Sequence, residues 1–158
     1  MTDPTADLQP GQVLARGVCR FLIDQGLAPV TELSPVRGLR TDVTALAPNG
    51  EIWVVECKSS VADFRSDAKW EGYLEWCDRF YFAAPPDLPD DLLPTDHGLM
   101  IADGYGAEIV RPAVKRPLAT ARRKAQTQRI ARVAALRLRA VADPGAAGLI
   151  SAADLSGA

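Results

Sequence analysis

The segment of residues 51–58 places two opposite charges at the end of an apolar run that is typical of a β-strand. It follows Pro48-Asn49-Gly50, a strong turn signal. Because side chains alternate along a strand, one face carries Ile52, Val54, Glu56 and Lys58, and the other carries Trp53, Val55 and Cys57. Burying an unpaired charge is expensive, so Glu56 and Lys58 must be paired, hydrated or bound to a metal ion.

A second strand-like stretch, residues 40–47, precedes this run across the turn. Asp42 falls on one face of it, together with Arg40, Thr44 and Leu46. If the two stretches pair as a hairpin, Asp42 lies at the same end as Glu56 and Lys58. An aspartate on one strand and Glu-x-Lys on its partner indicate a site for a metal ion and a phosphate group.

Hydrophobic periodicity predicts the fold class: an α/β protein with the order α-β-β-β-α-β, followed by a β-hairpin and a terminal helix. We expect helices at residues 12–25, 66–77 and 119–141, and strands at 29–33, 40–47, 51–58, 79–84, 98–103 and 107–110. A helix between the third and fourth strands predicts a mixed sheet with helices on its faces.

A chain of 158 residues has the length of one domain. We expect a flexible N-terminus at residues 1–9, a single domain at 10–142 and a disordered tail at 143–158. No apolar run approaches the ~20 residues of a membrane span, so the prediction is a cytoplasmic protein without membrane contact. Three distant cysteines, Cys19, Cys57 and Cys77, fit reduced core residues.

The net charge of −2 conceals an uneven distribution. Ten of the 18 Lys and Arg residues lie within residues 109–142, and none of the 20 Asp and Glu residues does. An acidic body with one basic helix is a pattern often found in nucleic-acid binding. The charge pattern therefore suggests a nucleic acid as partner.

The spacing of Asp42, Glu56 and Lys58 on this element order resembles the PD-(D/E)XK nuclease-like superfamily, whose fold is that of the restriction endonucleases. A longer string resembles the MmcB family of bacterial DNA-repair proteins over about residues 10–112. It consists of Arg40-Thr41-Asp42-Val43, Glu56-Cys57-Lys58-Ser59-Ser60, Asp63-Phe64, Asp67, Lys69-Trp70, Tyr73 and Trp76-Cys77-Asp78. Two positions depart from the superfamily pattern: the first helix offers Arg16 and Arg20 where many members have a glutamate, and Thr41 replaces a proline.

Phosphodiester hydrolysis needs an activated water and neutralisation of the charge that develops on the phosphate, and Mg²⁺ or Mn²⁺ serves both needs. Asp42 and Glu56 would supply carboxylate oxygens to the metal, and the resemblance implies the carbonyl of Cys57 as a further ligand. Lys58 would orient the water or offset charge. We expect Glu32 and Lys69 to support these catalytic residues.

Further residues are candidates for DNA contact because they are basic or polar and lie near this site or on the terminal helix. They are Arg16, Arg20, Arg40, Ser59, Ser60, Tyr73, Arg122, Arg123, Lys124 and Arg129. Asp63 and Asp67 are more typical of loop and helix-start residues than of ligands. His97 is the single histidine, so the sequence offers neither a Ser-His-Asp system nor clustered zinc ligands.

Three hypotheses of function follow. The first is a Mg²⁺-dependent DNA endonuclease acting in DNA repair, where the repair role rests on the resemblance. The second is a DNA-binding module of the same fold without turnover, which the missing helix-one glutamate favours. The third is an adaptor in which these charges are structural. The sequence leaves open the DNA substrate, the number of metals, a homodimer and a repair-protein partner.

Overall fold

The computed structural model describes residues 2–158, apart from the side chain of Asp90, so Met1 of the predicted flexible N-terminus lies outside it. Six strands form one sheet in the order β1-β2-β3-β4-β5-β6. The strands are β1 (Ala28–Leu33), β2 (Thr41–Leu46), β3 (Ile52–Cys57), β4 (Arg79–Ala84), β5 (Gly98–Ala102) and β6 (Ala107–Arg111). The helices are α1 (Pro10–Asp24), α2 (Val61–Ser66), α3 (Thr120–Ala142), α4 (Pro144–Ala147) and α5 (Ala152–Ser156), with 3₁₀ turns η1 (Trp70–Trp76) and η2 (Asp90–Leu92).

The sheet is mixed, as the sequence predicts. β3 pairs in parallel with β4, and β4 with β5, whereas the other three neighbouring pairs are antiparallel. Parallel neighbours need a crossover, and α2 and η1 supply it between β3 and β4. The predicted order of an α/β core followed by a hairpin and a basic helix is confirmed, and it is the order that the nuclease-like resemblance implies.

The β2–β3 hairpin forms around the predicted turn. Gly50 adopts a φ of 85°, a left-handed conformation that glycine takes without steric cost. The register pairs Leu46 with Ile52 and Val43 with Val55. Asp42 precedes Val43 and Glu56 follows Val55, so the hairpin brings both carboxylates to the same end of the sheet.

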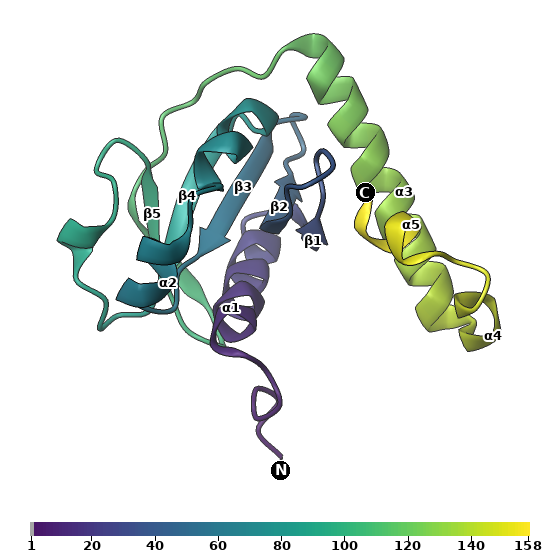
Figure 1. Cartoon of the computed structure of the whole chain (residues 1–158), viewed down its shortest axis with the longest axis horizontal. Helices are drawn as coiled ribbons and strands as arrows, with labels where there is room; N and C mark the ends of the chain where they lie inside the picture. The colour runs from purple at the N-terminus through teal and green to yellow at the C-terminus, as the bar shows by residue number, and fades with distance from the viewer. Residues whose placement is uncertain (1) are drawn as a thin grey trace.

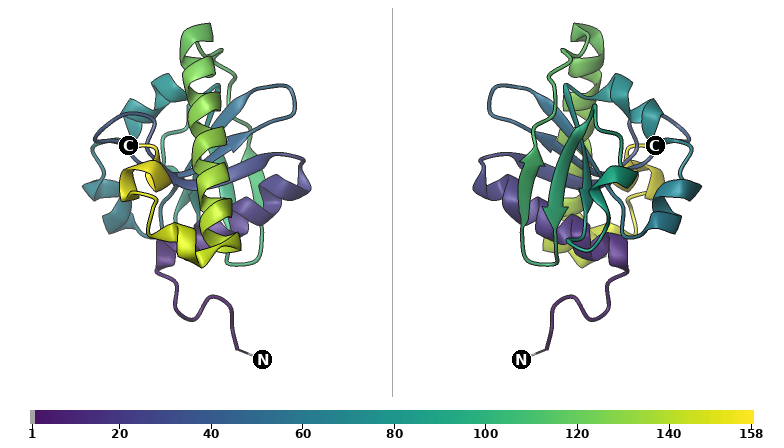
Figure 2. Two further views of the ribbon diagram at one scale, coloured as in Figure 1. Left: turned by 90° about the vertical axis from the view of Figure 1, so that its right-hand side faces the viewer. Right: turned by 90° about the vertical axis from the view of Figure 1, so that its left-hand side faces the viewer.

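Two apolar layers enclose the sheet. On one face, α1 packs Leu14, Val18 and Leu22 against inward-facing residues of β2 to β5 such as Val43 and Val55. On the other face, Val54, Phe80, Phe82 and Leu99 pack with Tyr73 of η1 and with Ile130 and Val133 of α3. Figure 1 shows α3 along one side of the molecule, beside β1 and β2, and Figure 2 shows the β5–β6 edge on the opposite side.

The crossover differs from the single helix predicted for residues 66–77. α2 ends at Ser66, and a 3₁₀ helix begins at Trp70. Asp67 interrupts the helix with an extended backbone, φ −87° and ψ 113°. Its carboxylate accepts hydrogen bonds from Lys58 Nζ and from the N–H of Lys69, and these contacts compete with helix continuation.

The C-terminal segment also differs from the disordered tail predicted for residues 143–158. It contains α4 and α5, which fold back beside α3 (Figure 1). Three hydrogen bonds hold this segment in place. The N–H of Ser34 donates to the Ser156 carbonyl, Arg137 donates to the Leu155 carbonyl, and Arg129 donates to the Gly157 carbonyl. The basic helix therefore serves partly as a support for the tail. Across residues 2–158, no helix has the length and apolar character of a membrane span.

Candidate metal and nucleic-acid site

The C-terminal end of β3 gathers three of the predicted catalytic residues. The N–H of Cys57 donates a 2.8 Å hydrogen bond to Asp42 Oδ2, which joins β2 to β3 at this point. Lys58 Nζ lies 3.3 Å from Glu56 Oε1 and 2.5 Å from Asp67 Oδ2. Glu56 and Lys58 are buried, with 6% and 3% exposure, so these charges lie largely out of water. The sequence predicted the meeting of Asp42, Glu56 and Lys58 but not the part taken by Asp67.

Burial and mutual repulsion set the electrostatics of the two carboxylates. Desolvation raises the pKa of Glu56 well above its usual range, and the neighbouring Asp42 charge raises it further. Desolvation also raises the pKa of Asp42, although the Cys57 N–H and Lys58 oppose this. Two carboxylates that both resist ionisation in a shared site are a setting in which a bound cation would be stabilising.

Lys58 stays protonated in this environment. Burial alone would lower the pKa of Lys58, but its hydrogen bond with Asp67 and the charge of Glu56 outweigh burial and raise it. Burial likewise acts to raise the pKa of Asp67, and the hydrogen bond from Lys58 reverses this and lowers it. Lys58 and Asp67 therefore form a charged pair beside the two carboxylates.

One oxygen of Glu56 has no partner. Glu56 Oε2 is a buried acceptor without a hydrogen bond anywhere in the described chain, while Oε1 is held by Lys58. An unsatisfied buried acceptor is costly, and a metal ion is one way to satisfy it. The donor set thus fits a hard divalent cation in its chemistry.

The site supplies few protein ligands. Among residues 2–158, no group of three or more His, Cys, Asp or Glu side chains comes together as a metal cluster. Cys57 buries its thiol in the layer under α1, which leaves its main-chain carbonyl as the group that fits the predicted ligand role. Two carboxylates with water suit Mg²⁺, because Mg²⁺ usually retains several waters and one or two carboxylates.

A cavity of about 470 Å³ opens beside Asp42. Its wall includes Gln12 and Arg16 of α1, Glu32 of β1 and Arg40. Glu32 reaches Arg40 at 3.8 Å in an exposed ion pair, and its φ of 52° is left-handed, which is uncommon for a residue other than glycine. Glu32 thus lines the same cavity as Asp42, and its described side-chain partner is Arg40.

Lys69 and Tyr73 lie on the far side of Arg40. They line a second cavity of about 390 Å³, together with Ser34, Leu39 and Arg40. The Tyr73 hydroxyl donates a 2.8 Å hydrogen bond to the Arg40 carbonyl. No described hydrogen bond or ion pair joins the Lys69 ammonium to Asp42 or Glu56, and the contact of Lys69 with this site is its N–H bond to Asp67.

Many residues predicted to contact DNA have partners within the protein. Ser59 donates to the Asp63 carboxylate, and Ser60 caps α2 by accepting from the Asp63 N–H. Arg16 and Arg20 of α1 donate to the carbonyls of Gly104 and Tyr105. On α3, Arg122 pairs with Glu75, Arg123 with Asp78, and Arg129 with the Gly157 carbonyl. Lys124 is exposed and has no polar side-chain contact in the described part of the chain.

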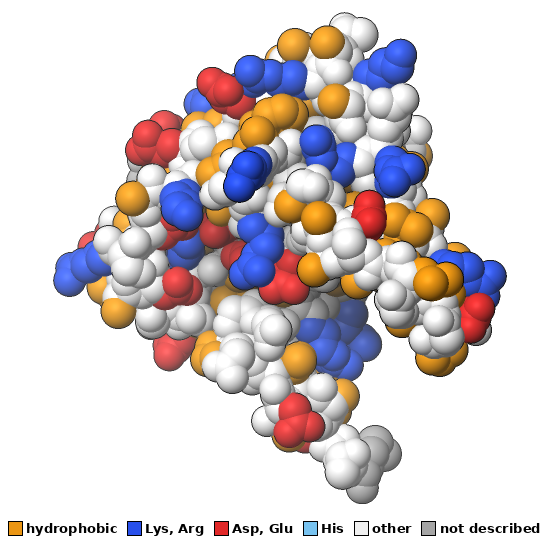
Figure 3. Space-filling view, turned by 45° about the vertical axis from the view of Figure 1, so that its right-hand side comes forward, with side chains coloured by type: hydrophobic (Ala, Val, Ile, Leu, Met, Phe, Trp, Pro, Cys, Tyr) orange, Lys and Arg blue, Asp and Glu red, His pale blue; other side chains and the backbone are white. Residues whose placement is uncertain are grey.

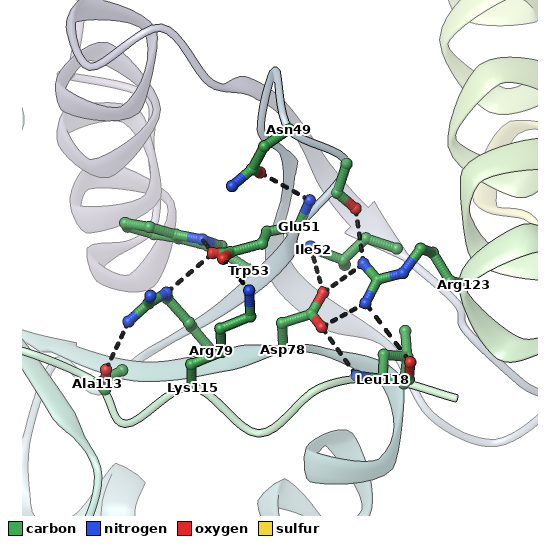
Figure 4. Close-up of polar contacts among 11 residues, drawn as sticks. Asn49, Glu51, Ile52, Trp53, Asp78, Arg79, Ala113, Lys115, Leu118 and Arg123 are labelled. Carbon is green, nitrogen blue, oxygen red and sulfur yellow. Dashed lines mark hydrogen bonds and ion pairs between the residues drawn. The ribbon is translucent and has the colours of Figure 1, made fainter. Parts of the chain in front are cut away.

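A second polar cluster, which the sequence did not reveal, lies at the N-terminal end of β3 (Figure 4). Asp78 is 1% exposed, and both oxygens accept from Arg123 while also accepting from the N–H groups of Ile52 and Leu118. Glu51 accepts from Arg79, Trp53 and Lys115. The pKa of Glu51 falls to about 2 through the Lys115 contact, and that of Asp78 falls to about 2 because its bonds to Arg123 and the backbone outweigh burial. This cluster is closed and structural.

Comparison with known proteins identifies the family to which the chain belongs. A model of the MmcB-like family, described as DNA repair protein MmcB-like, matches residues 4–145, and the chain belongs to that family. A protein of unknown function from Silicibacter pomeroyi has a solved structure that is 59% identical, with a TM-score of 0.86, covering 88% of this chain and 95% of that chain. A repair endonuclease from Pyrococcus abyssi is 23% identical with a TM-score of 0.30, covering 45% of this chain and 34% of that one. No match was found among curated protein sequences.

Proposed function

We propose that this MmcB-like protein is a divalent-metal-dependent deoxyribonuclease that acts in DNA repair. The observation that carries the proposal is the buried, unpartnered oxygen of Glu56 at the end of the sheet that also holds Asp42 and Lys58. An oxygen in that position is costly to a purely structural cluster and useful to a metal site. The repair context comes from the family to which the chain belongs.

Each residue has a defined part in this proposal. Asp42 and Glu56 would hold Mg²⁺ or Mn²⁺, with the Cys57 carbonyl beside them, and the ion when bound would lower the pKa of a water and offset phosphate charge. Lys58 presents a protonated ammonium that stabilises negative charge developing on the phosphate. Asp67 keeps that ammonium in place at 2.5 Å. Glu32 and Lys69, which line the adjoining cavities, would position the DNA strand and water.

Phosphate affinity would come from the cations that remain free around the site and on α3, such as Lys69 and Lys124. Phosphate contacts release counterions, so binding should weaken steeply as the salt concentration rises. Among residues 2–158 we identify no reader of base edges, so the proposal is for action without sequence specificity. The predicted cytoplasmic location, homodimer and repair-protein partner stay predictions.

A second candidate is a DNA-binding module of the same fold without turnover. The observation in its favour is on α1, where Arg16 and Arg20 bond to the β5–β6 turn in place of a carboxylate directed at the site. A binding module would retain DNA at moderate salt and leave its phosphodiester bonds intact. An adaptor, the third hypothesis, would not retain DNA.

A cleavage assay separates these candidates. The intact protein is incubated with Mg²⁺ or Mn²⁺ and single-stranded, duplex or branched DNA, beside Asp42→Ala and Lys58→Ala. Lys115→Ala is the matched control, because it removes a lysine that pairs with Glu51 near the N-terminal end of β3. We expect metal-dependent cutting that is lost in Asp42→Ala and Lys58→Ala and retained in the control. Activity that survives both site variants would show that the site is wrong, and retention of uncut DNA would favour the binding module.

A further inference from the structure

Two cavities adjoin at Arg40, at the end of the sheet that carries Asp42. Arg40 lines both the cavity of about 470 Å³ beside Asp42 and the cavity of about 390 Å³ beside Lys69. Its main chain is fixed by the hydrogen bond from Tyr73, whereas its side chain is 66% exposed. Its ion pair with Glu32 spans 3.8 Å between exposed groups and is therefore weak. The guanidinium is free to exchange that partner for a phosphate group.

The size of each cavity suits a single nucleotide. Both volumes fall within the ~300–1,000 Å³ of pockets that enclose one small ligand. A duplex would instead need a long row of cations. On α3, however, Arg123, Arg129 and Arg137 direct their guanidinium groups to carboxylate or carbonyl oxygens of this chain. Figure 3 shows the face that carries α3, where acidic and basic side chains are interleaved.

An exposed aromatic ring is linked to the first cavity through Arg16. Tyr105, in the β5–β6 turn, is 57% exposed, and the Arg16 guanidinium lies 5.4 Å from its ring centroid. Arg16 also lines the cavity beside Asp42 and so links the two features. The turn is held against α1 at Gly17, where a Cβ atom would lie 1.9 Å from the Asp103 carbonyl oxygen. Asp103 further fixes the turn by accepting from the N–H groups of Tyr105 and Gly106.

We propose that these features form a track for an unpaired DNA strand. Consecutive nucleotides occupy the two cavities on either side of Arg40, their phosphates contact Arg40 and Lys69, and a neighbouring base stacks on Tyr105. Stacking on an aromatic ring beside a positively charged groove is how single strands are held without sequence preference. This inference rests on the proposed function in one respect, which is that the strand passes the catalytic carboxylate Asp42.

Fluorescence anisotropy in EDTA tests the track without cleavage. A labelled 12-nucleotide single strand and the matching blunt duplex are titrated with the intact protein, Arg40→Gln and Tyr105→Ala. Val110→Ala and Arg116→Gln are the matched controls, since both residues are exposed and lie outside the two cavities and outside α3. We expect the single strand to bind more tightly than the duplex, and each track variant to lose about tenfold in single-strand affinity. Each control should stay within about twofold of the intact protein.

Two results would overturn the track. One is duplex binding as tight as single-strand binding. The other is a loss in Arg116→Gln equal to that in Arg40→Gln, which would show that total charge and not the track sets affinity. Melting temperatures of the variants confirm that each is folded. The proposed nuclease is judged separately by the Mg²⁺ cleavage assay: single-strand selectivity without cutting would contradict the nuclease and leave the track standing.

Discussion

The two ends of β3 treat buried carboxylates in opposite ways. At the N-terminal end, Asp78 and Glu51 have a donor for each oxygen, and their pKa values fall to about 2. At the C-terminal end, Glu56 keeps an unpartnered oxygen, and burial with Asp42 raises its pKa. One end of the strand thus carries a fully paired ion cluster, and the other carries a cluster that keeps an acceptor for a further cation. The proposed metal site rests on that difference.

The largest effect on stability is expected at the N-terminal end. Asp78→Ala leaves Arg123 and the N–H groups of Ile52 and Leu118 without their acceptor. Breaking a buried pair in this way costs about 3–5 kcal/mol of the free energy of unfolding. Urea denaturation measures it. A loss below about 1 kcal/mol would mean that the cluster does not support the fold.

Acid should act on the two ends with opposite signs. Asp78 and Glu51 have lower pKa values in the folded state than in the unfolded state. Their contribution to the free energy of unfolding is therefore complete above roughly pH 5 and is lost as the pH falls toward 2. The loss is on the order of 2 kcal/mol per group. Glu56 has a raised pKa in the folded state. Its contribution to the free energy of unfolding is therefore largest below the ordinary glutamate pKa of about 4.3, and this contribution is lost as the pH rises through the pKa of the folded state. Denaturation of metal-free protein between pH 2 and 8 measures both. In a plot of the free energy of unfolding against pH, Glu56→Gln should remove the decline toward neutral pH and leave the decline toward acid pH unchanged. If Glu56→Gln removes the acid decline instead, the signs expected at the two ends are wrong.

Neutralising the carboxylate at the C-terminal end should leave the protein as stable or more so. Glu56→Gln removes repulsion with Asp42, while Lys58 retains Asp67. In metal-free protein we expect the free energy of unfolding of Glu56→Gln to stay the same or to rise by up to about 1 kcal/mol. Replacing a residue of a functional site often stabilises a protein in this way. Glu51→Gln, the matched change at the other end, should lose about 1–3 kcal/mol. If Glu56→Gln and Glu51→Gln lost equal free energies of unfolding, the two ends of β3 would not differ in how they hold their carboxylates.

The smallest effect is expected at Glu32. Its φ of 52° is strained for any residue with a side chain, so Glu32→Gly should stabilise the fold by up to about 1 kcal/mol. Glu32→Ala, which keeps the Cβ atom, is the control and should show no gain. If both variants behave alike, the backbone at this position is not under strain.

The sequence predicted the parts of this structure that depend on local periodicity. Alternation along residues 51–58 assigned Glu56 and Lys58 to one face, and the Asn49-Gly50 turn predicted the hairpin that brings in Asp42. Contacts over long distances were beyond such reasoning. Arg123 meets Asp78 across 45 residues, and Arg137 meets the Thr31 carbonyl across 106, so neither pairing leaves a local signal.

Asp67 is the instructive case at the site. Its position near the start of the helix expected at residues 66–77 is typical of a loop or helix-start residue, and the sequence analysis treated it as such. The structure shows a backbone that turns extended there because the carboxylate bonds both Lys58 and the Lys69 N–H. A sequence pattern finds residues that share a face of one element, but Asp67 reaches Lys58 only because the crossover folds back over the sheet.

The most direct test of the contrast between the two ends is Mn²⁺ binding, followed by electron paramagnetic resonance of the free ion. We predict saturable binding by the intact protein that is lost in Asp42→Asn and in Glu56→Gln and kept in Glu51→Gln. Undiminished binding in Glu56→Gln, or no binding by the intact folded protein, would contradict the proposal that the C-terminal end of β3 binds a divalent cation.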